Sequence, residues 1–463
     1  MIVLKFGGSS VADGERIQDV AKIIQTGSKE KIVVVSALGG VTDDLTDIMN
    51  KVVGLPADEV EREVEDFTEK FLARHRNVAG EAVSDVNVRL EAIEEIKKLT
   101  TKLKVALLGV GYLEELTSRS ADYILSFGER LSIIILAATL NSNGVKAKHL
   151  NGFEAGILTD SSFGRARPLF DQINEKTREN LLPLVKEGVI PVVAGFVAGD
   201  EKARITTLGR GGSDYTASII GSALGADEVQ IWTDVDGILS TDPRIVEEAR
   251  LIKKISYVEA LDLGYFGAKV IHSKMIEPAM KANVPVRVKN TFNPKNEGTL
   301  IVSKQEEIPE VVKAIAVAQD VVIVNLNGVG VAETPNIAGK LFSTLGDANI
   351  NIIMISGSSE SNLSFVVDKS ESQKAVKLLE RELGSQVVER LSLMEDVAIV
   401  TVVGAGMHGT KGIAAKIFTE IAEIDVNIIM IAQGSSEVNI AFMVLSEDVD
   451  EVVETLHSKF IGG

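Results

Sequence analysis

Two segments in the first half of the chain carry residues that could bind an anion. Lys5–Gly8 contains two glycines after a short apolar stretch, and glycine lets backbone N–H groups approach an anion closely, although a structural turn also explains Gly-Gly. The segment 206–214, TTLGRGGSD, precedes the apolar segment 215–224, which has helical character. Arg210 offers a planar fork suited to a carboxylate, and Ser213 is typical of a helix N-terminus, which carries partial positive charge. We predict an anion site there.

Three further segments carry charged residues beside glycine: SFGER at 126–130, TDVDG at 233–237 and FGAK at 266–269. Each has a plain alternative when it is taken alone. A glutamate can sit on a helix surface, an aspartate can cap a turn, and a lysine can be solvated. Together they are stronger evidence for a functional site, because they follow one another in order along one α/β scaffold.

Other sites are disfavoured. Gly404–Gly409 matches the spacing G-x-G-x-x-G, but a tight turn explains it better, because the corresponding position of a sister repeat is Glu333. The chain contains neither a P-loop motif nor a protein-kinase H-R-D motif. Its five histidines lack ligand spacing and it has no cysteine, so no metal site is predicted.

Composition limits the partners and the compartment. The net charge of −18 disfavours nucleic acid and anionic membrane surfaces as partners. No apolar run reaches about 18 residues and no signal peptide is recognisable, so we expect neither a membrane span nor secretion. The absence of cysteine fits a reducing compartment. Together these features predict a cytoplasmic protein.

Short apolar stretches predict the elements that position the charged segments. Residues 2–6, 31–38, 190–195 and 229–233 read as strands, with helix-like segments between them. This pattern predicts an α/β fold to about residue 300, with a mainly parallel sheet covered on both faces. The Glu- and Lys-rich segment 57–105 reads as surface helices.

The last third of the chain contains an internal repeat. The sequence NIIMI at 351–355 recurs without change at 427–431. Each copy reads as a βαββαβ module of the ferredoxin-like kind. A turn-rich stretch at 293–298 and a charged, Pro-containing segment at 304–310 suggest a boundary before the repeat. We predict three domains, 1–300, 311–388 and 394–463.

These motifs closely resemble those of aspartate kinases in the amino acid kinase family. The resemblance rests on KFGGSSV at 5–11, SFGER at 126–130, TTLGRGGSDYTA at 206–217, TDVDGI with TDPR at 233–244, and GAKVIH at 267–272. The repeat looks like the paired ACT domains of those enzymes, so the resemblance covers essentially the whole chain. It implies a three-layer αβα kinase domain followed by two ACT domains.

The resemblance implies phosphoryl transfer from MgATP to the side-chain carboxylate of L-aspartate, with Mg²⁺ held mainly through the nucleotide phosphates. Such a carboxylate is ionised at pH 7, so catalysis needs positioning and positive charge and no general base. Lys5, Arg210 and Asp214 would be the catalytic residues, with Asp214 orienting Lys5. The residues implied to bind substrate are Thr42, Glu129, Phe196, Arg210 and Ser213. Those implied to bind nucleotide are Lys5, Gly7, Gly8, Ser9, Thr233, Asp234, Leu239, Arg244 and Lys269; the N–H groups of Gly7 and Gly8 would contact phosphates.

The resemblance also implies regulation by an amino acid. Gln433 lies in the loop of the second ACT copy that often contacts the effector, and the first copy lacks this glutamine. Asn427 and Asn439 are the neighbouring effector-binding candidates. We expect threonine or lysine as the inhibitor, and a dimer or tetramer formed through the ACT domains. The inhibitor and the oligomer size stay open.

Two alternatives stay open beside this interpretation. The fold could phosphorylate another acceptor, but Glu129 with Arg210 fits a zwitterionic amino acid. The chain could instead be a catalytically dead amino-acid sensor, although it retains Lys5 and Asp214. A fused homoserine dehydrogenase is not expected, because the sequence ends at residue 463.

Overall fold

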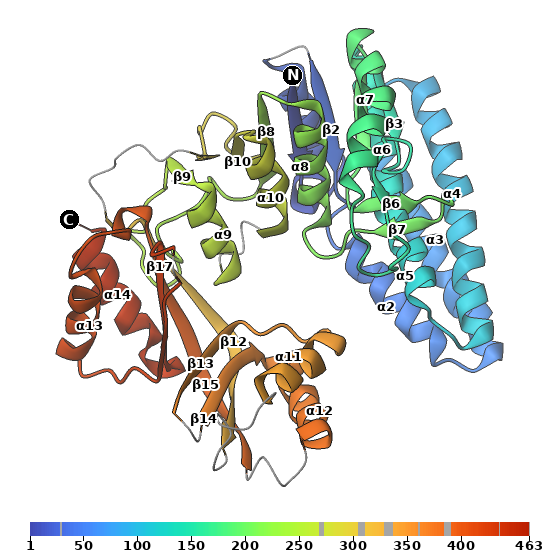
Figure 1. Ribbon diagram of the computed structural model, residues 1–463. Coiled ribbons are helices and arrows are strands. Elements are labelled where there is room, and N and C mark those ends of the chain that lie inside the picture. Colours follow the sequence, from blue (N-terminus) through green and yellow to red (C-terminus); the bar gives the residue numbers. More distant parts are fainter. Residues whose placement is uncertain are drawn as a thin grey trace. The chain divides into compact units, whose positions relative to one another are not determined.

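The computed structural model divides into two compact units (Figure 1). The first comprises Met1–Ile238, Lys253–Tyr257 and His272–Ser303, and the second comprises Leu239–Ile252, Val258–Ile271 and Lys304–Gly463. The structure describes residues 1–27, 30–267, 273–303, 311–327, 337–359, 362–383, 390–434 and 436–462.

The first unit is built on an eight-stranded sheet with the order β3-β5-β2-β1-β8-β10-β11-β9. Its strands are β1 (Ile2–Phe6), β2 (Lys31–Val35), β3 (Ala147–Leu150), β5 (Ile190–Ala194), β8 (Glu228–Thr233), β9 (Lys254–Ser256), β10 (Val286–Asn290) and β11 (Thr299–Val302). Every pair is parallel except β10 with β11. The four predicted strands and the mainly parallel sheet are therefore confirmed. A small second sheet holds β4 (Leu158–Thr159), β6 (Val197–Asp200) and β7 (Ile205–Thr207).

Helices cover both faces of the large sheet, which gives the predicted three layers. They are α1 (Gly14–Gln25), α2 (Val41–Val53), α3 (Ala57–Ala82), α4 (Val86–Leu113), α5 (Ser118–Leu125), α6 (Phe127–Ser142), α7 (Phe170–Lys186), α8 (Gly212–Leu224) and α10 (Ser273–Ala282), with a short 3-10 helix η1 (Gly8–Val11). Side chains alternate along a strand, so Leu4 and Phe6 face the core with α1 and α6. Lys5 faces the opposite layer, where α8 packs against β1.

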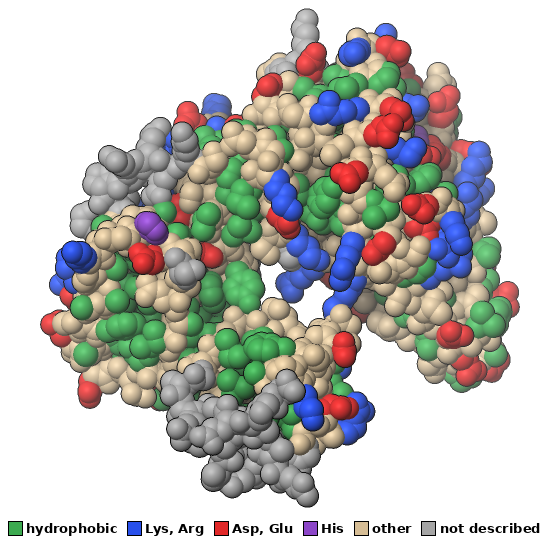
Figure 2. All heavy atoms as spheres, viewed as in Figure 1, with side chains coloured by type: hydrophobic (Ala, Val, Ile, Leu, Met, Phe, Trp, Pro, Cys, Tyr) green, Lys and Arg blue, Asp and Glu red, His purple; other side chains and the backbone are tan. Residues whose placement is uncertain are grey.

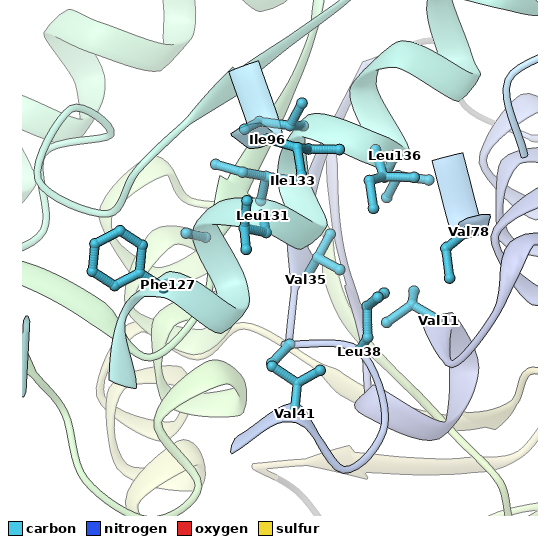
Figure 3. Packing of buried hydrophobic residues seen from close by; sticks show 14 of the residues in the cluster. Val11, Val35, Leu38, Val41, Val78, Ile96, Phe127, Leu131, Ile133 and Leu136 are labelled. Atoms are coloured by element: carbon cyan, nitrogen blue, oxygen red, sulfur yellow. The ribbon is translucent and has the colours of Figure 1, made fainter. Parts of the chain in front are cut away.

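The core under α3 and α6 is mainly apolar, and His75 of α3 is a fully buried polar side chain beside Phe71. Figure 3 shows Leu131 and Leu136 of α6 packed among side chains such as Val35 of β2 and Val78 of α3. The helical stretch Ser118–Ser142 is long and apolar enough to cross a membrane, but 83% of its most apolar 18-residue part is buried inside the protein. Most of this stretch is α6, which is buried along nearly its whole length and is therefore a core helix.

The predicted surface helices of 57–105 are α3 and α4, which form a long antiparallel pair. Each buries one stripe, including Val64 and Phe71 on α3 and Leu103 on α4, and exposes the rest. The visible face of the first unit carries interspersed Lys, Arg, Asp and Glu side chains (Figure 2).

The second unit is a six-stranded sheet with the order β13-β14-β12-β15-β17-β16. Its strands are β12 (Ala314–Asn327), β13 (Met354–Ser359), β14 (Asn362–Asp368), β15 (Arg390–Val403), β16 (Met430–Ala432) and β17 (Asn439–Leu445). Its helices are α9 (Tyr257–Tyr265), α11 (Ile337–Asp347), α12 (Ser372–Leu383), α13 (Ile413–Glu423) and α14 (Val449–Phe460), with 3-10 helices η2 (Lys369–Glu371), η3 (Ala405–Met407) and η4 (Ser446–Asp448). Helix α13 follows α11, and α14 follows α12, at nearly the same spacing along the chain as the two NIIMI segments, which confirms the repeat.

The two modules of the repeat exchange strand halves. Residues 321–327 of β12 pair with β14 and with the start of β15, whereas 314–318 pair with the end of β15. Ile315 accordingly packs in the core of the second module, beside α13 and α14. If the chain were divided at a single point between the two modules, the second module would lack residues 314–318 of β12. The boundaries 311–388 and 394–463 stay a prediction.

Candidate active site

A cleft of about 640 Å³ opens at the carboxyl ends of β1, β2 and β5, inside the first unit. Ligands of open parallel sheets bind at this edge, where strand order reverses around β1. The lining includes eight residues predicted from the sequence: Lys5, Gly8, Thr42, Glu129, Phe196, Arg210, Ser213 and Asp214. The two segments that are predicted to bind an anion, which lie far apart in the sequence, thus line one cleft.

Lys5 is the buried cation of this cleft. Its Nζ lies 2.7 Å from Asp214 Oδ1, and the two side chains are 10% and 18% exposed. Asp214 belongs to the first turn of α8, so the ion pair fixes the ammonium at the N-terminus of that helix. This contact matches the predicted orientation of Lys5 by Asp214.

Left-handed glycines shape the loops around Lys5. Gly40 precedes α2 with a φ of 80°, and Gly211 precedes α8 with a φ of 71°. Residues with a Cβ rarely adopt this conformation. Both helices therefore begin at the cleft with backbone N–H groups that favour negative charge.

Glu129 is a buried acidic residue of the cleft. It is 4% exposed, and its Oε2 has no hydrogen-bond partner among the residues that the structure describes. Burial raises the pKa of Glu129 to about 8, although the backbone N–H of Ala37 and the charge of Lys5 act in the opposite direction. A buried carboxyl with an unsatisfied oxygen is costly unless a ligand partners it. It is suited to an ammonium group.

Arg210 lies on the exposed rim of the cleft, as does Thr42, whereas Ser213 is buried. Phe196 follows β5 with a φ of 64°, which is strained for an aromatic residue. Its backbone is fixed in place, because its N–H donates to Thr216 Oγ1 and its carbonyl accepts from Leu208. Such strain is typical of binding sites.

Two residues that the sequence did not single out hold the cleft walls. Asp122 of α5 lines the cleft and is 1% exposed, and it accepts hydrogen bonds from Thr207 and Gly164. Arg74 of α3 donates to the Gly39 carbonyl and to Asp44 at the start of α2. An aspartate on the buried side of a helix was the available signal for Asp122, whereas nothing in the sequence links Arg74 to residue 39.

The backbone N–H of Gly7, which is predicted to contact a phosphate, has a partner inside the protein in this structure. The N–H of Gly7 donates to the Trp232 carbonyl at 3.1 Å, because β1 continues its pairing with β8 for one residue beyond the strand. Gly8 lines the cleft, and its Cα lies close to the Ala37 carbonyl, which a Cβ would approach to 3.1 Å. Ser9 is exposed beside it.

The predicted nucleotide residues do not all lie in one unit. Thr233 and Asp234 follow β8 in the first unit, and their side chains hydrogen-bond to each other at 3.0 Å. Leu239 and Arg244 belong to the second unit, where Arg244 pairs with Asp242 at 2.5 Å. Lys269 lies outside the described residues.

The predicted effector residues differ in their environment. Asn427 and Gln433 are exposed. Asn439 is 8% exposed, and its Nδ2 donates to Asp262 Oδ2 of α9 at 2.8 Å. In this structure Asn439 is therefore engaged inside the second unit. No group of three or more potential metal-binding side chains occurs within the described ranges.

Comparison with known proteins identifies the family. The family model for the amino acid kinase family matches residues 1–290, and the one for the ACT domain matches 324–383 and 400–460. Aspartokinase 1 of Arabidopsis thaliana, a chloroplastic enzyme, is 35% identical over 99% of this chain and 80% of its own length. The chain belongs to the aspartokinase family.

Solved aspartokinase structures share the fold. E. coli aspartokinase III in complex with aspartate and ADP, in the R-state, matches with a TM-score of 0.83 and 30% identity over 99% of each chain. The same enzyme with lysine and aspartate, in the T-state, matches with a TM-score of 0.81, 30% identity and coverage of 100% of this chain and 99% of that one. The aspartate kinase of Clostridium acetobutylicum matches with a TM-score of 0.78, 30% identity and coverage of 99% and 100%. The predicted αβα layers and ACT modules are thus those of an aspartokinase.

Proposed function

We propose that this aspartokinase-family chain is an ATP-dependent L-aspartate kinase. The observation that carries the proposal is Glu129, a buried carboxyl with an unsatisfied oxygen in a cleft that also holds Lys5 and the rim residue Arg210. This set matches a zwitterion that carries a further carboxylate: Glu129 suits an ammonium, Arg210 an α-carboxylate, and Lys5 the reacting group. The aspartate and ADP bound to E. coli aspartokinase III support the proposal.

In the proposed reaction an oxygen of the aspartate side-chain carboxylate attacks the γ-phosphorus of ATP. A new O–P bond forms, the bond between the γ-phosphorus and the β–γ bridging oxygen breaks, and 4-phospho-L-aspartate and ADP leave. No proton is removed from the nucleophile, because the carboxylate is already ionised. Lys5, fixed by Asp214, and the N-terminus of α8 supply positive charge where negative charge spreads in the transition state.

The nucleotide would lie beyond the carboxyl end of β8, contacted by Thr233, Asp234, Leu239, Arg244 and Lys269, with phosphates near Gly8 and Ser9. Mg²⁺ would be held mainly through the phosphates and would supply further positive charge when bound. Asp242 would have to release Arg244 for such a contact, since the two form a bidentate pair.

Regulation by an amino acid belongs to the same proposal. We propose that lysine or threonine inhibits the enzyme at the ACT modules, near Asn427 and Gln433, and that these modules pair between chains into a dimer or tetramer. Lysine bound to the T-state of E. coli aspartokinase III favours lysine. The proposed domains are 1–300, 311–388 and 394–463, with the strand half 314–318 added to the last. Cytoplasmic localisation is proposed from the absence of cysteine, which fits a reducing compartment.

ADP release by the purified chain tests the function. Activity with MgATP is compared between L-aspartate, L-glutamate and no acceptor, and with an Arg210→Ala variant. We expect aspartate-dependent turnover that the variant loses by about 100-fold in kcat/KM, as expected for a lost charge-assisted contact. Turnover with glutamate would support another acceptor, and binding of lysine or threonine without any turnover would support a dead sensor.

A further inference from the structure

Asp122 connects three separate segments of the cleft. Its Oδ1 accepts from Thr207 Oγ1 at 2.6 Å. Its Oδ2 accepts from the backbone N–H of Gly164 at 2.9 Å and from that of Thr207 at 3.3 Å. The donors are distant from Asp122 in the sequence, on the β4–α7 loop and at the end of β7. One carboxylate therefore holds two loops against α5.

Both loops lead to the substrate side of the cleft. Thr207 is the last residue of β7, and Arg210 follows shortly after it on the turn that starts α8. Gly164 lies against this turn, because a Cβ on Gly209 would come within 3.9 Å of the Gly164 carbonyl oxygen. The Arg210 turn itself has left-handed glycines on either side, Gly209 and Gly211. Its geometry thus depends on how it is anchored.

The buried position of Asp122 matches an anchoring role. The side chain is 1% exposed, and the contacts that the structure gives it are hydrogen bonds from N–H and hydroxyl groups. Burial raises the pKa of Asp122, and the hydrogen bonds from Thr207 and Gly164 act against that rise. An asparagine has the same shape but no charge and only one acceptor oxygen, so the charge-assisted hydrogen bonds are weakened, and the Thr207 hydroxyl cannot donate to it while that oxygen accepts from the two backbone N–H groups.

We propose that Asp122 is a positioning residue that holds Arg210 at the place where it binds the α-carboxylate of the amino-acid substrate. The proposal rests on the proposed function for the role of Arg210. It differs from a purely structural role in one respect: the effect on substrate must pass through Arg210.

A double-mutant cycle tests this route. Asp122→Asn is expected to raise KM for L-aspartate on the order of tenfold, with kcat and KM for MgATP changed less than threefold. In an Arg210→Ala background the same change is expected to raise KM less than twofold. An equal rise in both backgrounds, or an unchanged KM in folded Asp122→Asn protein, would overturn the proposal.

Asp200→Asn provides the matched control. Asp200 is also 1% exposed and accepts four hydrogen bonds, from Lys202, Ser161 and two groups of Arg204, at the other end of the β6–β7 hairpin. It does not belong to the cleft lining. We expect this variant to lower the thermal midpoint as much as Asp122→Asn does, with KM for L-aspartate unchanged. A tenfold rise in KM for L-aspartate in Asp200→Asn would show that the effect of Asp122→Asn comes from general loosening of the β6–β7 hairpin.

Hydrogen exchange separates failure of this inference from failure of the proposed function. Asp122→Asn is expected to speed amide exchange at least tenfold in 162–166 and 207–212, and not in α3 or α4. If the wild-type chain shows no aspartate-dependent turnover, the proposed function fails, while faster exchange still establishes the anchor. Unchanged exchange in those two segments would refute the anchor even in an active enzyme.

Discussion

Two buried glutamates, one in each unit, are treated differently by the fold. Glu129 of the first unit is 4% exposed and has one oxygen without a partner among the described residues. Glu259 of the second unit is fully buried, lies 3.2 Å from Lys313 Nζ and accepts from the Ala405 N–H at 2.7 Å. The second carboxylate is satisfied inside the protein, whereas the first keeps one oxygen unsatisfied, as the proposed binding of an ammonium group requires.

In the proposed function, this difference separates a substrate-binding residue, Glu129, from a structural one, Glu259. A buried carboxylate that is paired and hydrogen-bonded fixes the elements around it, here α9, the residue before β12 and the 3-10 helix η3. A buried carboxyl without a full set of partners destabilises the protein unless binding compensates it. Changing each residue should therefore give opposite results for stability and for activity.

The largest expected effect is on the stability of the second unit. Lys313→Met leaves Glu259 buried without its cation, which costs about 3–5 kcal/mol of unfolding free energy. Urea unfolding, followed through the second unit's transition, measures it. Replacing both partners by apolar residues, Glu259→Leu with Lys313→Met, is expected to recover most of the loss. If Lys313→Met is as stable as wild type, the Glu259–Lys313 ion pair does not contribute to stability.

Glu129→Gln is expected to do the reverse. It removes a costly buried acid, so the free energy of unfolding stays equal or rises by about 1 kcal/mol. It also removes the proposed partner of the substrate ammonium, so kcat/KM for L-aspartate falls about 100-fold, or about 2.7 kcal/mol. Steady-state kinetics and thermal unfolding on one preparation measure both. Loss of stability together with unchanged kcat/KM would make Glu129 structural.

The raised pKa of Glu129 predicts a pH dependence of substrate binding. Between about pH 6 and 8 the empty cleft holds Glu129 protonated, and an ammonium ligand favours the ionised form, so binding releases a proton. The dissociation constant for L-aspartate should therefore fall about tenfold per pH unit as the pH rises towards 8, and then level off. Calorimetric titration in buffers of different ionisation enthalpy measures the proton. Glu129→Gln should show no such release.

The raised pKa of Glu129 also affects stability: a rise in pH strengthens substrate binding but lowers the free energy of unfolding. The pKa of Glu129 is raised from 4.5 to about 8 on folding, so its contribution is fully present below about pH 4.5 and is lost as the pH rises through about 8. The stability difference between Glu129→Gln and wild type should accordingly grow in favour of the variant between these values. A difference that is constant over that range would contradict the assigned pKa.

The smallest expected effect concerns Asn439. Burial raises the pKa of Asp262, and the hydrogen bond from Asn439 acts against that rise. Asn439→Ala removes one hydrogen bond to a carboxylate, so we expect a loss of about 1–2 kcal/mol in the second unit's unfolding free energy. Its effect on kcat/KM without effector should be less than twofold. Thermal unfolding and kinetics check both.

The sequence predicts those features best that depend on residues close together in the chain. The glycines and charges of 206–214 define a helix N-terminus by themselves, and the internal repeat follows from identical residues. The sequence could not reveal contacts that depend on backbone groups distant along the chain. The N–H of Gly7 is used by Trp232, and Asp122 acquires its partners only when β7 and the β4–α7 loop fold onto α5. The exchange of strand halves between β12 and β15 has no local signature, because both halves read as ordinary strand.

The central claim is that the cleft recognises an amino-acid zwitterion through Glu129. Comparing kcat/KM for L-aspartate with that for succinate, which lacks only the ammonium group, tests it most directly. We predict that wild type prefers L-aspartate by about 100-fold or more and that Glu129→Gln reduces this preference to less than about fivefold. A variant that keeps the full preference would contradict the claim, because another group would then have to bind the ammonium.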